Sequence, residues 1–532
     1  MAEMAKLNEQ LQLSNAQIRK GKVSIPKYRA MVLDQAAEND TSLLISRDEY
    51  FRNLVSQIHS IELTDYPIPE ELDQVLRDYQ KAGFRWLSAL QHNGFAGLLA
   101  DEMGLGKSVQ VIALIKSLAK HHTLIICPAS LVYNWSNEFT KFAPDLETVM
   151  VIGNAAQREE LIHAHTDNEI LITSYDSIKR DVELYEGHHF DIEVIDEAQY
   201  IKNAATQAAS SVKEINASFR IALTGTPIEN RLSELWSIFD YLMPGFLFTY
   251  RHFRNAYELP IVRDQDEETM NRLREMIAPF ILRRLKQDVL KDLPDKLEEV
   301  SYAPLEGEQK ELYEARVQRL KIMLGKQSDE EFRKNRIAVL AELTRLRQLC
   351  CSPALVYDTY KGNSAKEDLC IDLIERATSE GHKILLFSQF TSMLDLLIKR
   401  LEQQGIQYHL LTGSTTIKDR SRMVEQFQNN DVPIFCISTK AGGTGLNLTA
   451  ADIVIHYDPW WNTAVENQAT DRAHRIGQDK IVSVYRLIVK DTIEERILKL
   501  AEQKADLAGE ILSGEEMSSA SITREQLMSI LS

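Results

Sequence analysis

The sequence is poor in cysteine. Its five cysteines form no Cys-x-x-Cys pair and are Cys127, Cys350, Cys351, Cys370 and Cys436. An odd, sparse set argues against a structural zinc site and fits a reducing compartment. The neighbours Cys350 and Cys351 are interpreted as two small buried residues on a helix rather than as a redox pair.

Long apolar runs are also missing. No run reaches the roughly 18 residues that are needed to cross a bilayer. The first residues, Met-Ala-Glu-Met-Ala-Lys, are polar and lack the apolar core of a signal peptide. We therefore expect a cytoplasmic protein that has no membrane partner.

Positive charge does not dominate either, because 61 Lys and Arg residues face 78 Asp and Glu residues, a net charge of −17. This acidity argues mildly against a nonspecific coat of nucleic acid, but it does not exclude a basic cleft on an acidic body. Hydrophobic residues make up 44% of the chain, an ordinary value for globular proteins. The length of 532 residues suggests about three to four domain-sized units.

Two parts of the chain alternate short apolar runs with helical stretches, which indicates βαβ units and parallel sheets. The first part has strand candidates at residues 94–100, 123–128, 169–174, 190–195 and 219–224. The second part has them at residues 382–387, 408–411, 433–438, 452–456 and 481–485. Residues from about 230 to 345 are helical and charged, with no continuous strand series. The sequence therefore predicts an α/β protein of two units, separated by a helical insertion.

A glycine-rich loop, Gly104-Leu-Gly106-Lys107-Ser108, lies between a predicted strand and a predicted helix. Glycines let the backbone approach phosphates, and a helix N-terminus offers free N–H groups. Lys107 would reach the β and γ phosphates and Ser108 would ligate Mg²⁺. Asp101 stands where the general phosphate-loop pattern has its first glycine.

An acidic pair, Asp196-Glu197, follows the predicted strand that ends at Ile195. One carboxylate at the end of such a strand can hold Mg²⁺ and the next can position the attacking water. Alone, such a pair is usually a solvated turn. The phosphate loop at the end of a neighbouring strand favours the catalytic interpretation.

Two arginines, Arg472 and Arg475, are three residues apart, a spacing that places them on one face of a helix. Arginines aimed at a γ phosphate neutralise the charge that builds in the transition state. The alternative is a basic surface pair that makes ordinary ion pairs.

Taken together, these motifs resemble those of the Swi/Snf-type ATPases, a family of helicase superfamily two. The matching stretches follow the family's order and are Leu76–Gln80, Ala100–Ser108, Ile126–Leu131 with Trp135, Asp196–Gln199, Leu223–Pro227 with Asn230, Ile384–Gln389, Ser438–Asn447 and Asp471–Gln478. The last two are highly specific to the family. The resemblance implies two RecA-like parallel-sheet lobes in tandem, with ATP and Mg²⁺ as cofactors.

The resemblance also implies roles for single residues. Gln80 reads the adenine, Gln468 lies close to the γ phosphate, and Arg472 and Arg475 act as arginine fingers. Asp196 and Glu197 match the Mg²⁺-binding and water-activating pair. Further implied sites are Thr224 and Thr226, which link hydrolysis to lobe movement, and Gly443 and Gly445, in a loop that meets nucleotide and DNA. Gln199 departs from the histidine of many members, which puts the fine coupling of hydrolysis to movement in doubt.

The implied domains are an accessory N-terminal segment at 1–70, a first lobe at 71–295 with a helical insertion from about 230, a helical linker at 296–345, a second lobe at 346–490, and a brace helix and tail at 491–532. Lys22–Ala30, followed by Phe51-Arg52, resembles the accessory region of bacterial members. We therefore expect the chain to be the C-terminal motor portion of a longer bacterial protein, located at the nucleoid.

The expected track is double-stranded DNA, contacted through its phosphates because a motor must ignore sequence. Candidate contacts are Ser130, Thr173, Ser438, Thr439 and Lys440, and the basic cluster Arg283-Arg284-x-Lys286. The family implies remodelling of protein–DNA complexes without strand separation, by a monomer whose cargo stays open between RNA polymerase, a nucleoid protein and a repair complex. Two alternatives are an inactive scaffold with the same fold and an unwinding or RNA-directed helicase.

Overall fold

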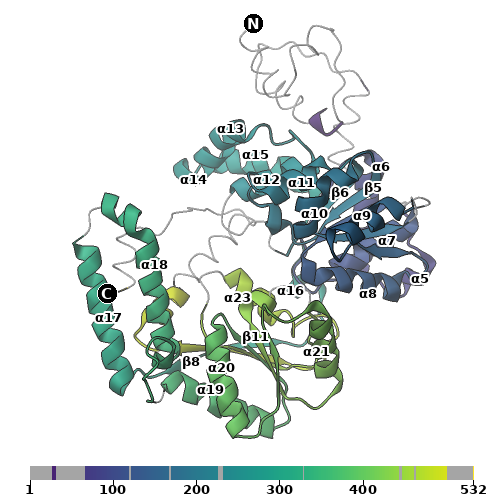
Figure 1. Ribbon diagram of the computed structural model, residues 1–532. Helices are drawn as coiled ribbons and strands as arrows, with labels where there is room; N and C mark the ends of the chain where they lie inside the picture. Colours follow the sequence, from purple (N-terminus) through teal and green to yellow (C-terminus); the bar gives the residue numbers. More distant parts are fainter. Residues whose placement is uncertain are drawn as a thin grey trace. The chain divides into compact units, whose positions relative to one another are not determined.

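The computed structural model describes most of the chain after residue 65. The described residues are 27–30, 49, 66–118, 122–166, 169–225, 232–326, 329–362, 364–442, 446–459, 463–499 and 531. They divide into two compact units, and the chain passes from the first to the second between Lys291 and Asp292. We call these units the first lobe and the second lobe and describe each by itself (Figure 1).

The first lobe is built on a seven-stranded sheet in which every pairing is parallel. Its spatial order is β3-β4-β2-β5-β6-β1-β7. Central strands are buried along their length, as expected for a parallel sheet that helices cover on both faces. The strands are β1 (Gly97–Leu99), β2 (Thr123–Cys127), β3 (Thr148–Met150), β4 (Ile170–Ser174), β5 (Phe190–Ile195), β6 (Ala217–Leu223) and β7 (Ile281–Leu282).

Helices connect these strands and then form the first part of the predicted insertion. The connecting helices are α5 (Glu70–Asp73), α6 (Asp78–Asn93), α7 (Lys107–Ser117), α8 (Val132–Phe142), α9 (Ala155–Ala164), α10 (Tyr175–Asp181) and α11 (Gln207–Glu214). The insertion helices are α12 (Leu232–Leu242), α13 (Tyr250–Phe253), α14 (Leu259–Asp264) and α15 (Glu267–Ile277), after which β7 returns the chain to the sheet and α16 (Lys286–Val289) leads out of the lobe.

The second lobe has a six-stranded sheet, again parallel at every pairing, in the order β10-β11-β9-β12-β13-β8. Alternate residues of a strand point to opposite faces. In β9, Ile384 and Leu386 therefore join one buried cluster, whereas Leu385 and Phe387 join another on the opposite face. The strands are β8 (Lys296–Ala303), β9 (Ile384–Ser388), β10 (Tyr408–Leu411), β11 (Ile434–Ser438), β12 (Ile453–His456) and β13 (Val482–Val489).

Helices cover both faces of this second sheet. Residues of α19 and α20 pack into the first of these clusters, and residues of α21 and α23 pack into the second. A long pair, α17 and α18, shares a further core with residues 489, 493 and 497 (Figure 1). The helices are α17 (Gly307–Gly325), α18 (Asp329–Cys351), α19 (Ala365–Ser379), α20 (Thr391–Gln403), α21 (Ile417–Asn429), α22 (Thr439–Gly442) and α23 (Thr463–Thr470).

The two parallel-sheet lobes confirm the predicted α/β class, but the strand prediction was incomplete. Residues 296–345 were expected to be a helical linker, yet their first part is β8, which pairs with β13 along its whole length. With the sequence Lys-Leu-Glu-Glu-Val-Ser-Tyr-Ala, this edge strand carries charge and is partly solvated, so it has no apolar run. The strands β3 and β7 were not predicted, because segments of three and two residues are too short to show a strand pattern.

The predictions about the cysteines and about membrane-spanning helices can be compared with the described residues. All five cysteines are buried and form no disulfide, and Cys350 and Cys351 lie side by side at the end of α18, as expected. Within the described ranges, no helix is both long and apolar enough to cross a bilayer. Residues 491–499 of the predicted brace helix are described, and 493–499 of them are helical.

Candidate active site

The phosphate loop occupies the turn between β1 and α7. Gly104 and Gly106 adopt positive φ angles of 86° and 73°, which residues with a side chain rarely tolerate. A Cβ at Gly106 would also lie 2.4 Å from the Gln80 Nε2 atom. Lys107 and Ser108 then begin α7, so the loop leads into a helix N-terminus, whose first N–H groups have no acceptor within the helix, as a phosphate site requires.

Lys107 folds back over the loop that carries it. Its Nζ donates to the carbonyl oxygen of Asp101 at 2.7 Å. Its positive charge also acts on Asp196, where it lowers the pKa of that carboxyl against a larger opposing effect of burial. The structure therefore brings the lysine and the acidic pair of the sequence prediction together in one lobe.

Gln80 lies directly against the loop, held by the first turn of α6. Its Oε1 accepts from the backbone N–H of Arg77 at 2.9 Å, and its Nε2 donates to the carbonyl oxygen of Leu105 at 3.0 Å. The neighbouring Tyr79 hydroxyl donates to the same carbonyl at 2.9 Å, and burial raises the pKa of Tyr79 to about 12. The adenine-reading role of Gln80 stays a prediction, but its position beside the loop suits that role.

Asp196 is held from two sides at the carboxyl end of β5. Its Oδ2 accepts from the indole N–H of Trp135 and its Oδ1 from the backbone N–H of Glu197, both at 2.9 Å. Burial, with the neighbouring Glu197 carboxylate, raises the pKa of Asp196. A divalent cation would favour the ionised form and supply the missing positive charge. The carboxylate of Asp196 and the hydroxyl of Ser108 are oxygen donors of the kind Mg²⁺ prefers, so these residues fit that ion.

Glu197 is positioned by its backbone and by a chain of hydrogen bonds. Its φ of 55° is unusual for a residue with a side chain and turns the chain sharply after β5. The Nε2 of Gln199 donates to Glu197 Oε2 at 2.8 Å, and Gln199 Oε1 accepts from the Thr224 hydroxyl at 3.2 Å. Gln199, which stands where many family members have histidine, thus connects the predicted catalytic carboxylate with the threonine predicted to link hydrolysis to movement.

Arg472 and Arg475 lie in the second lobe, just beyond α23, where Gln468 is buried. The expectation that both arginines share a helical face was wrong. The helix ends at Thr470, and backbone bonds to the third residue back, such as that from Ala473 N–H to the Thr470 carbonyl, interrupt the helical pattern. Arg475 donates to the carbonyl oxygen of Leu446 at 3.3 Å.

Gln478 fixes the segment that carries these arginines. Its Nε2 donates to the carbonyl oxygens of Thr449, Ala451 and Ala473 at 2.8 to 3.1 Å. The segment is therefore tied to the loop after residue 445, which the resemblance places near nucleotide and DNA. Gly443, Gly445 and Thr226 lie outside the described residues, so their predicted roles stay predictions.

Several predicted DNA contacts do not lie on the surface. Thr173 is fully buried in β4, because both faces of that parallel strand are covered, and Ser438 and Thr439 are also buried. In the basic cluster, Lys286 is buried and Arg284 points inward, which leaves Arg283 exposed. Arg284 and Lys286, predicted to contact DNA within a basic cluster, therefore do not form such a cluster on the surface.

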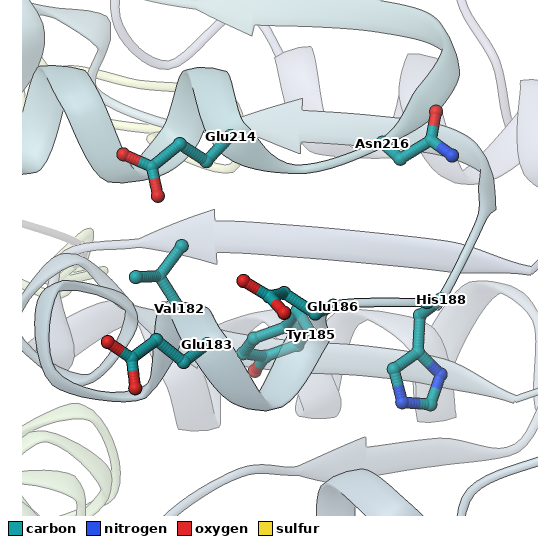
Figure 2. Close-up of a pocket in the computed structure, with 8 residues that line it drawn as sticks. Val182, Glu183, Tyr185, Glu186, His188, Glu214 and Asn216 are labelled. Carbon is teal, nitrogen blue, oxygen red and sulfur yellow. The ribbon is translucent and has the colours of Figure 1, made fainter.

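A pocket of about 520 Å³ lies in the first lobe, at the amino ends of strands β5 and β6 (Figure 2). Its lining residues include Glu183, Glu186 and Glu214, with His188 and Asn216 just before β5 and β6. The pocket lies at these amino ends, whereas the phosphate loop follows the carboxyl end of β1, the parallel neighbour of β6. The pocket is thus separate from the candidate active site.

A phosphate loop and an oriented acidic pair in one parallel-sheet lobe, followed by a second such lobe with paired arginines, define a helicase-like ATPase. Comparison with known proteins agrees. Residues 79–355 match the SNF2-related domain, residues 365–477 match the helicase conserved C-terminal domain, and residues 1–69 match the bacterial SNF2 helicase associated domain. The first match alone covers more than half of the sequence, and the chain belongs to the SNF2-related family.

Relatives of the chain have names consistent with this family. It is 39% identical over 535 residues to an uncharacterized ATP-dependent helicase of Mycoplasma pneumoniae, covering 99% of this chain and 51% of that protein. It is also 39% identical to a candidate ATP-dependent helicase/translocase of Bacillus subtilis, covering 89% and 53%. The chain thus spans about half the length of these relatives. The SWI2/SNF2 ATPase core of Sulfolobus solfataricus, solved in complex with dsDNA, is 37% identical over 83% of this chain and 93% of that one, with a TM-score of 0.41.

Proposed function

We propose that this chain is a DNA-stimulated ATPase that moves along double-stranded DNA and remodels protein–DNA complexes without separating the strands. It would work as a monomer in the cytoplasm, at the bacterial nucleoid. Its cargo would be a protein bound to DNA, with RNA polymerase and nucleoid proteins as the first candidates. The chemistry is supported by the site described above, and the track by family membership.

The observation that carries the proposal is the orientation of the acidic pair. Trp135 holds Asp196, and Gln199 holds Glu197. Carboxylates fixed at the end of a parallel strand, beside the lysine of a phosphate loop, are suited to bind Mg²⁺ and to orient a water molecule. An inactive scaffold with the same fold would not need its carboxylates held in this orientation. The orientation therefore favours an enzyme.

The proposed cycle assigns a task to each residue group. Gln80 recognises the base, Lys107 binds the β and γ phosphates, and Glu197 orients the attacking water. Ser108 and Asp196 hold Mg²⁺, which when bound neutralises charge on the phosphate oxygens. Arg472 and Arg475 stabilise the charge of the transition state once the lobes close, so that hydrolysis and lobe movement alternate.

Duplex DNA as the track is supported by the stretches Ser438–Asn447 and Asp471–Gln478, which resemble those of the Swi/Snf-type family most specifically. Motors of this kind grip the phosphate backbone, because base contacts would tie them to one sequence. The name of the Bacillus subtilis relative combines helicase and translocase, so strand separation needs a test separate from that of ATP hydrolysis.

The test is the rate of ATP hydrolysis without nucleic acid and with duplex DNA, single-stranded DNA or RNA. The three nucleic acids are compared at equal concentrations of their nucleotide units. The expected result is strong stimulation by duplex DNA. Equal or greater stimulation by RNA would overturn the proposed track. Absence of hydrolysis under every condition would favour the scaffold instead.

One variant in each lobe serves as a control for this assay. Glu197→Gln should still bind ATP but stop turnover, because the amide cannot act on the water. Arg475→Ala should lower kcat by roughly 10³-fold, the typical effect of losing an arginine finger. A near-normal rate in either variant would show that its assignment is wrong.

A further inference from the structure

The segment that leads out of the first lobe runs beside the phosphate loop. Strand β7 pairs with β1, and the pairing continues beyond both strands. Ala100 N–H donates to Leu282 at 2.7 Å, and Glu102 N–H donates to Arg284 at 3.0 Å. The approach to the phosphate loop is thus backed by residues that lie far along the chain.

Arg284 makes a two-pronged ion pair with Asp101, the residue that replaces the first glycine of the general phosphate-loop pattern. Its Nε donates to Asp101 Oδ1 at 2.8 Å, and its Nη2 donates to Oδ2. The Asp101 side chain is fully buried and that of Arg284 is 13% exposed. Asp101 also accepts from Lys107 through its backbone carbonyl, so one residue joins the buried arginine to the phosphate-binding lysine.

Gln110 closes the cluster from within α7. Its Oε1 accepts from Arg284 at 2.7 Å, and its Nε2 donates to Asp101 Oδ2 and to the Gly106 carbonyl, both at 3.2 Å. Gly83 provides the space, because a Cβ there would lie 1.8 Å from Gln110 Oε1 and 2.8 Å from Arg284 Nη2. The cluster therefore touches the loop at both Asp101 and Gly106.

Arg284 also reaches the segment that carries Gln80. Its Nη1 donates to the carbonyl oxygen of Tyr79, and its guanidinium lies over the Tyr79 ring at 5.1 Å from the centroid. Tyr79 and Gln80 both donate to Leu105 in the loop. A single side chain thus braces the loop and the predicted base-reading segment at once.

We propose that Arg284 is a positioning residue for nucleotide binding. It fixes the phosphate loop through Asp101 and Gln110, and it fixes the base-reading segment through Tyr79. The inference rests on the proposed function only in taking the ligand to be an adenine nucleotide. Arginine suits the position because its planar fork pairs with both carboxylate oxygens and stacks on an aromatic ring, which a lysine cannot reproduce.

The experiment measures the dissociation constant of a fluorescent ADP for the full chain, with Mg²⁺ and without nucleic acid. Arg284→Gln is expected to weaken binding by about tenfold or more, since several charge-assisted hydrogen bonds are lost. Arg284→Lys is expected to weaken it less. In ATP hydrolysis, KM should rise while kcat at saturating ATP is largely retained, whereas a partly unfolded preparation would lose kcat at unchanged KM.

The chain offers a matched control in Arg158, which forms a second buried, two-pronged pair with Asp181 in the same lobe. Its Nε and Nη2 donate at 2.6 and 2.8 Å, and both side chains are 7% exposed. Arg158→Gln should lower the melting temperature but leave the dissociation constant within about twofold, because it loses an equivalent ion pair away from the loop.

A dissociation constant for Arg284→Gln equal to that of the wild type, or shifted no more than in Arg158→Gln, would overturn the proposal. If Arg284→Gln does not fold, Arg284→Lys decides, and unchanged affinity in that variant has the same meaning. The proposed function is tested by a different result: it fails if duplex DNA does not stimulate ATP hydrolysis by the wild type. That result would leave the nucleotide measurement standing.

Discussion

At the scale of single residues, the acidic pair depends on side chains that carry no catalytic chemistry of their own. Trp135 and Gln199 each give one hydrogen bond to a carboxylate, and each comes from outside the pair. The Trp135 contact joins residues 61 positions apart in the sequence. The orientation of the predicted catalytic pair is therefore set by packing around β5 as much as by the motif that follows it.

Trp135→Phe should raise the Mg²⁺ concentration for half-maximal ATP hydrolysis about tenfold. The change keeps an aromatic ring but removes a hydrogen bond to a charged group, a loss of about 1.5–3 kcal/mol. The control is Trp86→Phe, which removes an indole bond of 3.1 Å to the Pro279 carbonyl instead. Equal Mg²⁺ dependence in the two variants would contradict the role given to Trp135.

At the scale of elements, residues 493–499 are fixed to α19 by one buried ion pair. Lys366 Nζ donates to both oxygens of Glu494 at 2.6 and 2.7 Å, and neither side chain is exposed. Glu494 also accepts from the Val489 N–H at 3.0 Å, so the pair joins the helix, the end of β13 and α19.

Lys366→Met or Glu494→Leu alone should destabilise the second lobe by about 3–5 kcal/mol, because each leaves an uncompensated buried charge. The double variant should cost clearly less than the sum of the two. Chemical denaturation of the four proteins, analysed as a double-mutant cycle, measures the coupling. Additive losses would show that the two side chains act independently.

The second element with a measurable consequence is β12, which ends in His456. This ring is buried, lies within hydrogen-bonding distance of the Thr470 hydroxyl at 2.9 Å, and has its pKa lowered by burial to about 3. In the unfolded chain its pKa is about 6.5. At a pH between these two pKa values, His456 is protonated in the unfolded chain but neutral in the folded lobe. The free energy of unfolding therefore falls as the pH falls.

His456→Gln keeps a polar group beside Thr470 but cannot titrate. From pH 7 to pH 5 the wild type should lose about 2 kcal/mol more stability than this variant, at about 1.4 kcal/mol for each pH unit below 6.5. Melting temperatures across this range give the comparison. Parallel profiles for the two proteins would contradict a neutral, buried His456.

At the scale of elements, some features could be predicted from the sequence and others could not. The loop Gly104–Ser108 and the pair Asp196-Glu197 are local patterns, so their chemistry and their placement at strand ends could be predicted. Strand β8 could not, because its charged, half-solvated edge has no apolar run. The partner of Asp101 could not either, since Arg284 lies 183 residues away and was predicted to contact DNA.

At the scale of the whole molecule, the residues of the predicted catalytic site are far apart in the sequence and divide between the two units. Lys107, Asp196 and Glu197 lie in the first lobe, and Arg472 and Arg475 lie in the second. Each lobe also holds, by its own contacts, the residues next to the point where the chain passes from one lobe to the other. Glu102 of the first lobe accepts from the Lys286 N–H at 2.7 Å, and within the second lobe His474 lies 2.9 Å from the Pro294 carbonyl.

The most direct test of an ATP-driven motor on duplex DNA is displacement of a labelled third strand from a triplex placed ahead of the protein. With ATP, the wild type should release the third strand while the two strands of the underlying duplex stay paired, and Glu197→Gln should release none. Separation of the duplex strands, or no release of the third strand despite DNA-stimulated hydrolysis, would contradict the proposal.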